Sequence, residues 1–140
     1  MSFHQMIAHP RFLHRLMAAD ALATGATGVL LLSAADLLAP LLNLPVGLQR
    51  AAGGICVVFA ACVLALSRSS GIPRGAVKAV IAINIAWVVA SVWVAFGGHW
   101  RPSVFGVCFV MAQALVVLAF VELGWFGLRA AGKRSLPHPV

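Results

Sequence analysis

Ionisable side chains inside apolar stretches are the groups of this chain best suited to chemistry. Asp20, Lys78 and Glu122 each lie within or at the edge of a long apolar run. A charge at membrane depth is costly and normally has a partner or a cavity. We predict that the three form one polar cluster in the same half of the membrane, where Lys78 bridges two carboxyl groups and a proton or cation can be held. The alternative is an interfacial role, with Lys78 extended to the headgroups and the carboxyl groups paired to Arg15 or Arg129.

Two threonines follow Asp20 at helical spacing. Thr24 and Thr27 stand four and seven residues after it, so the three side chains share one face of a helix. This stripe is predicted to make helix contacts or to bind a ligand.

The later runs carry amides, a hydroxyl and an indole at similar spacing. Asn84, Trp87 and Ser91 share one helix face, and we expect this face to bind another helix by hydrogen bonds, with a substrate contact as the alternative. Gln113 and Glu122 are nine residues apart and therefore point to opposite faces of their helix. One of these two groups thus faces away from the bundle unless a second subunit covers it, which favours an oligomer.

The three cysteines, Cys56, Cys62 and Cys108, form no CxxC pair. Such cysteines inside apolar runs are expected to be small buried hydrophobes. A disulfide between Cys56 and Cys108, which are predicted to lie at similar depth, is the alternative.

No pattern of a soluble-type enzyme or of a metal site is present. The sequence has no paired nucleophile and base, glycine-rich phosphate loop or zinc spacing. The histidines are expected to lie outside the spans, which disfavours haem or metal within the bilayer: they are His4, His9, His14, His99 and His138. We therefore expect no enzyme activity, no cofactor and no metal.

Composition places these residues in a membrane protein. The 140 residues are 62% hydrophobic and 9% charged, with mean hydropathy +1.01, so the chain could not cover a water-soluble surface. Four apolar runs approach or exceed the about 20 residues that cross a bilayer, and they predict an all-α integral membrane four-helix bundle. The expected spans are residues 16–38, 48–66, 75–96 and 103–128 in one domain, preceded by an interfacial segment, residues 1–15, and followed by a basic tail, residues 129–140. The alternative for the first run is a cleaved signal peptide, because it follows two arginines and ends in Ser33-Ala34-Ala35.

Charge predicts the orientation. Ten basic and three acidic residues give a net charge of +7, and eight of the ten basic residues lie near the two termini or in the middle loop. Since Lys and Arg are retained in the cytoplasm, both termini are expected there, with the basic termini at anionic lipid. The chain has no basic face interleaved with aromatic residues, so nucleic-acid binding is not expected.

Small residues are dense in the first two runs and predict close helix approach. They include Ala21, Gly25, Gly28, Ala51, Ala52, Gly53, Gly54, Ala60 and Ala61.

Three stretches resemble uncharacterised integral membrane proteins of bacteria. They are residues 48–53 (Leu-Gln-Arg-Ala-Ala-Gly), residues 80–91 from Val80 through Asn84 and Trp87 to Ser91, and residues 113–129 with Gln113-Ala114-Leu115, Glu122-Leu123-Gly124 and Gly127-Leu128-Arg129. The layout is also similar to the DoxX-like group of four-helix membrane proteins. The resemblance implies a four-helix bundle in a bacterial inner membrane and assigns no catalytic residue.

Two classes of function follow from these observations. The first is a non-enzymatic accessory or scaffolding subunit of a membrane assembly, present as a homo-oligomer or bound to a partner. The second is a small proton- or cation-linked transporter or channel subunit that uses Asp20 and Glu122. The two differ in one geometric feature, because transport requires Asp20, Asn84 and Glu122 to converge on one cavity.

Overall fold

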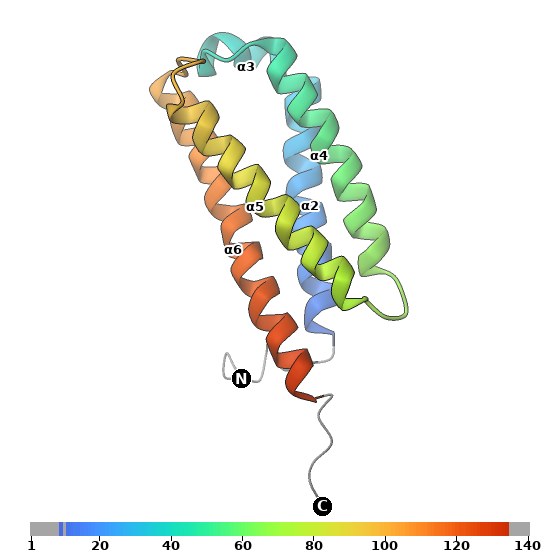
Figure 1. The fold of residues 1–140 in the computed structure, drawn as a ribbon. Coiled ribbons are helices and arrows are strands. Elements are labelled where there is room, and N and C mark those ends of the chain that lie inside the picture. The colour runs from blue at the N-terminus through green and yellow to red at the C-terminus, as the bar shows by residue number, and fades with distance from the viewer. Residues whose placement is uncertain (1–8, 10, 135–140) are drawn as a thin grey trace, which may run out of the picture.

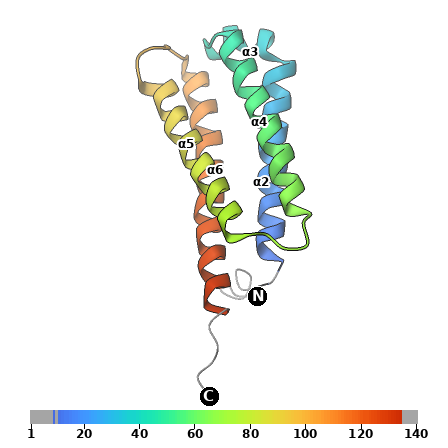
Figure 2. The same ribbon diagram turned by 45° about the vertical axis from the view of Figure 1, so that its right-hand side comes forward.

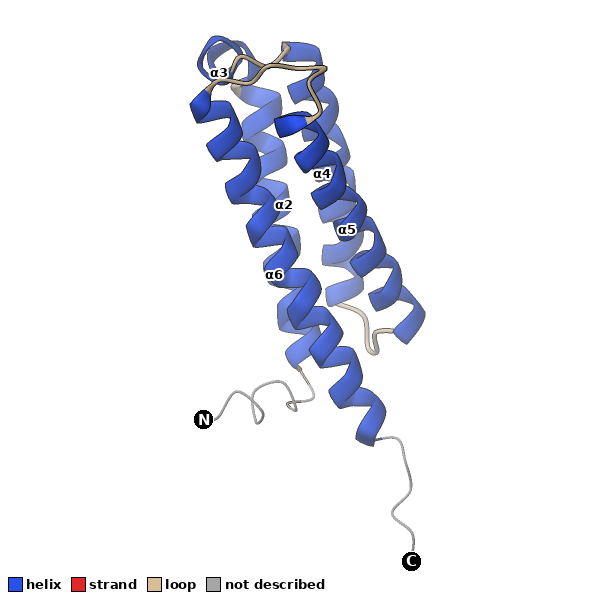
Figure 3. Cartoon of the chain, turned by 60° about the vertical axis from the view of Figure 1, so that its left-hand side comes forward, coloured by secondary structure: helices blue, strands red, loops and turns tan. Residues whose placement is uncertain are grey.

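The protein is a bundle of helices, as the composition predicts. The computed structural model describes residue 9 and residues 11–134, with the side chains of all but the last two. Every regular element in this part of the chain is α-helical (Figure 3). The helices are α2 (Phe12–Ser33), α3 (Ala35–Leu42), α4 (Val46–Ser67), α5 (Arg74–Phe96) and α6 (Val104–Arg134).

Four of these helices are long and apolar enough to cross a membrane. They are α2, α4, α5 and α6, the last over Val104–Gly132. The chain is therefore a multi-pass membrane protein, and the predicted number of spans is confirmed.

The boundaries of the first and last spans differ from the prediction. The first helix begins at Phe12 and ends at Ser33, whereas one continuous run over residues 16–38 was expected. The Ser33 hydroxyl donates to the Val29 carbonyl at 2.7 Å, a bond that often bends a helix, and the separate short helix α3 follows. Average hydropathy does not detect this break, because leucines dominate the sequence both before it (Leu30, Leu31 and Leu32) and after Asp36 (Leu37 and Leu38). At the other end α6 continues to Arg134, so the first part of the expected basic tail is helical.

Proline and serine residues set where the later helices begin. Pro45 and Pro73 have extended backbone and directly precede α4 and α5, consistent with the preference of proline for helix starts. The Ser103 hydroxyl accepts a hydrogen bond from the Gly106 N–H at 3.0 Å and caps the start of α6.

The spans associate as two helix pairs. The first helix pair consists of α2 and α4, and the second helix pair consists of α5 and α6 (Figure 2). Contacts between the pairs come mainly from α2 against α6 and from α3, which packs on both α4 and α6. By contrast, α4 and α5 share few contacts although they are consecutive in the chain. The start of α2 and the end of α6 lie at one end of the bundle, and α3 lies at the other (Figure 1).

Two glycines allow the close approach of α2 and α4. A Cβ atom added to Gly28 would lie 2.8 Å from the Gly53 carbonyl oxygen, and one added to Gly53 would lie 2.8 Å from the Gly28 carbonyl oxygen. The two backbones therefore touch without intervening side chains, as the density of small residues predicts.

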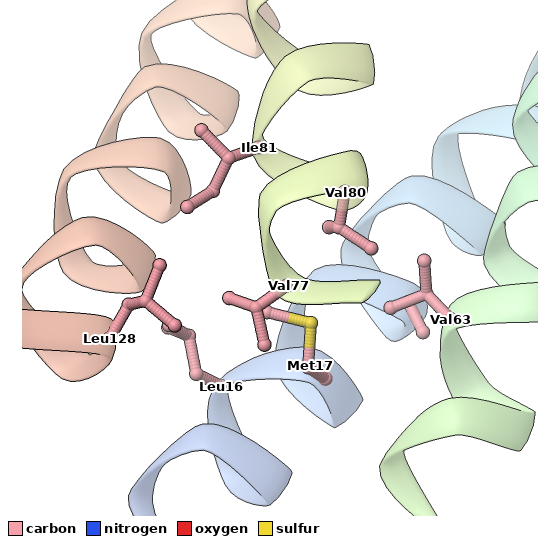
Figure 4. Close-up of a cluster of buried hydrophobic side chains, with 8 residues drawn as sticks. Leu16, Met17, Val63, Val77, Val80, Ile81 and Leu128 are labelled. Carbon is pink, nitrogen blue, oxygen red and sulfur yellow. The ribbon is translucent and has the colours of Figure 1, made fainter. Parts of the chain in front are cut away.

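Apolar side chains form a cluster at each end of the bundle. At the end where α2 begins, all four spans contribute, and Met17, Val63 and Val77 are almost fully buried there (Figure 4). At the opposite end Leu42 and Leu44 pack with Ala95 and Val110. In the sequence of α5 the buried polar residues Asn84 and Ser91 lie between Ile81 of the first cluster and Ala95 of the second.

Candidate functional site: polar pairs and cavities between the helix pairs

Asp20 is a buried carboxyl group that joins the two helix pairs. Its side chain is 1% exposed and lies roughly 12 Å along α2 from the start of the helix. Oδ2 accepts a hydrogen bond from the Asn84 amide on α5 at 2.9 Å, and Oδ1 accepts one from the Thr24 hydroxyl at 3.2 Å. Of the predicted stripe, only Asp20 bonds to another helix. Thr24 bonds to Asp20 within α2, and the Thr27 hydroxyl donates to the Ala23 carbonyl of the same helix.

A second set of polar side chains joins α5 to α6. The Trp87 indole N–H donates to Gln113 Oε1 at 3.0 Å, and Gln113 Nε2 donates to the Ser91 hydroxyl at 3.1 Å. Ser91 in turn donates to the Trp87 backbone carbonyl at 2.8 Å. These three residues therefore form one closed hydrogen-bonded set within the second helix pair.

The structure does not form the predicted cluster of Asp20, Lys78 and Glu122. Lys78 and Glu122 are both exposed, and within the described residues neither makes an ion pair with Asp20. The reason is the rotation of each helix about its axis. In α5 the buried face contains Val77 and Asn84, and Lys78 is turned about 100° away from Val77. In α6 Gln113 faces inward, so Glu122 faces outward as the spacing of nine residues predicts.

Two cavities lie between the helix pairs on the side where α4 and α5 share few contacts. The first has a volume of about 250 Å³, and its polar side chains include Asn84, Gln113 and Thr24. The second has about 230 Å³ and is bordered by Gln49, Ser91 and Gln113 among mostly apolar residues. Ile55, Trp87 and Gln113 border both cavities, so the two are neighbours along one cleft.

Sequence reasoning missed Gln49. This α4 residue is 3% exposed, its Nε2 donates to the Leu44 carbonyl at 3.0 Å, and its Oε1 is buried without a hydrogen-bond partner. Its burial was not expected, because Gln49 is a polar residue that precedes Arg50 and lies close to the loop before α4. Its position on the same helix face as Gly53 and Cys56, four and seven residues later, was the available signal.

His14 and the cysteines also differ from some expectations. His14 lies inside α2 rather than before it, and its Nε2 is 3.2 Å from the Ser69 carbonyl in the α4–α5 loop. His4 and His138 lie outside the described residues. All three cysteines are free, so the alternative disulfide is not formed. Cys56 is buried as expected, whereas the expectation of burial is wrong for Cys62 and Cys108, which are exposed. No group of three His, Cys, Asp or Glu side chains within the described residues is placed to hold a metal ion.

Comparison with protein-family models, curated proteins and solved structures finds no match to this chain.

Proposed function

We propose that the chain is a non-enzymatic integral protein of a bacterial inner membrane and serves as an accessory or scaffolding subunit of a membrane assembly. The observation that carries this proposal is that the intramembrane polar side chains form hydrogen bonds between helices. Asp20 binds Asn84 across the helix pairs, and Gln113 binds Trp87 within the second pair. Polar groups bonded in this way hold helices together in lipid, whereas Glu122, which transport would require at the same cavity, is exposed.

The outer face of the first helix pair supplies a surface for a partner. A groove between α2 and α4 is bordered mainly by small and aliphatic residues. Small side chains let the backbone of another transmembrane helix approach closely, which is how helices associate where lipid removes the hydrophobic drive. The proposed occupant is therefore an apolar transmembrane helix, from a second copy of this chain or from another subunit. The groove residues include Ala21, Gly25, Ala26, Ser33, Ala60 and Ala61.

The distribution of basic residues supports an orientation with both termini of the chain in the cytoplasm. Arg11, Arg15, Arg68 and Arg74 lie at the beginning of α2 and in or beside the α4–α5 loop. Arg129 stands over the Trp125 ring at 5.2 Å near the end of α6, a combination common at membrane interfaces. This end of the bundle is the one that the positive-inside rule assigns to the cytoplasm.

Photocrosslinking in native membranes tests the proposed role. A photoreactive phenylalanine analogue replaces Ala26 in the groove, and in a matched control it replaces Val89, a 64% exposed residue of α5 outside the groove. We expect Ala26 to give a discrete protein adduct, either a dimer of this chain or a defined heteromer, and Val89 to give lipid adducts alone. Equal adduct patterns at the two positions would contradict the proposal.

One observation favours a second candidate function, proton- or cation-linked transport. Asp20 is a buried carboxyl group, and its partners are an amide and a hydroxyl rather than a basic side chain. A charged carboxylate at that depth needs a positive charge nearby, which a proton or a cation would supply. Measurement of proton and cation flux into proteoliposomes tests this candidate. Asp20→Asn should abolish the flux, and Glu122→Gln should not. If the correctly inserted native protein carries neither protons nor cations, this candidate is removed.

A further inference from the structure

The cavity beside Gln49 has the features of a small-molecule site. Its volume is about 230 Å³, and a cavity of about 150 Å³ holds a benzene molecule. Scaled by volume, it accommodates a compound of about nine non-hydrogen atoms. Apolar side chains from α3, α4, α5 and α6 form most of its wall, including Leu42, Leu48, Val94, Phe109 and Val110.

The buried amide oxygen of Gln49, Oε1, accepts no hydrogen bond. The Leu44 carbonyl can only accept, so the atom of Gln49 that faces it at 3.0 Å must be Nε2. This fixes the amide orientation and leaves Oε1 as the atom without a partner. A buried acceptor in this state costs free energy. Gln49 is one of the residues that line the cavity, and its Oε1 atom is buried without a partner.

The other polar groups at this cavity are already bonded to one another. Gln113, Trp87 and Ser91 form the closed set described above. A buried water needs two to four polar partners, and Oε1 supplies one. A molecule with an apolar body and a single hydrogen-bond donor matches such a wall better than water does.

We propose that this cavity binds a small lipid-soluble molecule that carries a hydroxyl group, with the hydroxyl donating to Gln49 Oε1 and the apolar body lying against Leu48, Val94 and Phe109. The molecule enters from the bilayer, because the cleft is bordered on its outer side by exposed residues of α4 and α5, namely Ala51, Ile55 and Ala90. This site does not depend on the accessory role, since it lies between the helix pairs and not in the groove of the first pair.

Binding of a defined phenol by the purified protein tests the proposal. The probe is 4-ethylphenol, and its methyl ether is the matched compound without a donor. Saturable binding is measured as a rise in unfolding temperature at fixed detergent concentration. We expect the phenol to bind the native protein about five-fold more tightly than the ether, the ratio expected for one neutral hydrogen bond. Equal affinity of the two compounds, or no saturable binding, overturns the proposal.

Variants of α4 locate the binding. Gln49→Leu should bind phenol and ether alike, and Ala52→Leu, which fills the cavity wall, should lose both. Ala65→Leu adds the same side chain at an exposed position of α4 away from the cavity and should bind as the native protein does. If Gln49→Leu does not fold, the proposal is still tested by binding to Ala52→Leu and by the comparison of phenol with ether on the native protein. Unchanged phenol binding in Ala52→Leu would place the compound elsewhere and overturn the proposal.

Discussion

The Asp20 carboxyl group on α2 accepts a hydrogen bond of 2.9 Å from the amide of Asn84 on α5, 64 residues away in the chain. Both side chains are buried, at 1% and 4% exposure. This bond connects α2 of the first helix pair to α5 of the second.

Removal of the Asn84 amide should destabilise the bundle. In Asn84→Leu the buried Asp20 carboxyl loses a donor, and we expect the free energy of unfolding in detergent to fall by about 1 to 3 kcal/mol. Asp36→Asn is a suitable control, because its ion pair with Arg50 is largely exposed and should cost less than about 1 kcal/mol. Comparable losses in the two variants would show that the Asp20–Asn84 bond has no special role.

Neighbouring glycines of α4 should respond differently to a methyl group. In Gly53→Ala the new Cβ meets the Gly28 carbonyl oxygen, so α2 and α4 must separate and stability should fall by about 1 to 3 kcal/mol. Gly54 has open space around the same position, so Gly54→Ala should leave stability unchanged or raise it slightly. Chemical denaturation of the two variants measures the difference. A Gly54→Ala loss as large as that of Gly53→Ala would argue against this helix contact.

Gln113 should stabilise the fold of one chain rather than a contact between subunits. Its amide bonds Trp87 and Ser91 of the same chain, so Gln113→Leu leaves an indole N–H without a partner. We expect a loss of about 1 kcal/mol in stability and an unchanged distribution of oligomers by native mass spectrometry. A shift in that distribution would place Gln113 at a contact between subunits.

Lys78 should contribute little to stability. The side chain is exposed and has no ion-pair partner among the described residues. Lys78→Ala is therefore expected to change the free energy of unfolding by less than about 0.5 kcal/mol, well below the effect of Asn84→Leu. Thermal unfolding in one detergent compares the two variants, and a large loss in Lys78→Ala would revive the three-residue cluster.

Labelling of single cysteines tests the orientation. Ser70 lies in the α4–α5 loop, at the end of the bundle with most basic residues, and His99 lies in the α5–α6 loop at the other end. With the three native cysteines replaced by alanine, Ser70→Cys should react with an impermeant maleimide in inside-out vesicles alone, and His99→Cys in right-side-out cells alone. The reverse pattern would place both termini of the chain outside the cytoplasm.

The sequence by itself determined the properties that depend on local composition. The number of spans follows from runs of apolar residues, because the thickness of the hydrocarbon core sets their length. The capacity of the first two runs for close helix approach follows from their small residues, and the opposite facing of Gln113 and Glu122 follows from 3.6 residues per turn. Each of these properties can be read from one segment at a time.

Only the tertiary structure decided which side chain Asp20 contacts. Both Lys78 and Asn84 are candidate partners of Asp20 until the rotation of α5 is known, and packing of Val77 and Ile81 into the core sets that rotation. Lys78 and Asn84 are six positions apart in α5 and therefore lie on different faces of it, so both cannot reach Asp20. The break after Ser33 and the burial of Gln49 likewise depend on how α3 and α4 pack. Depth follows from position along one helix, whereas a contact requires the placement of two.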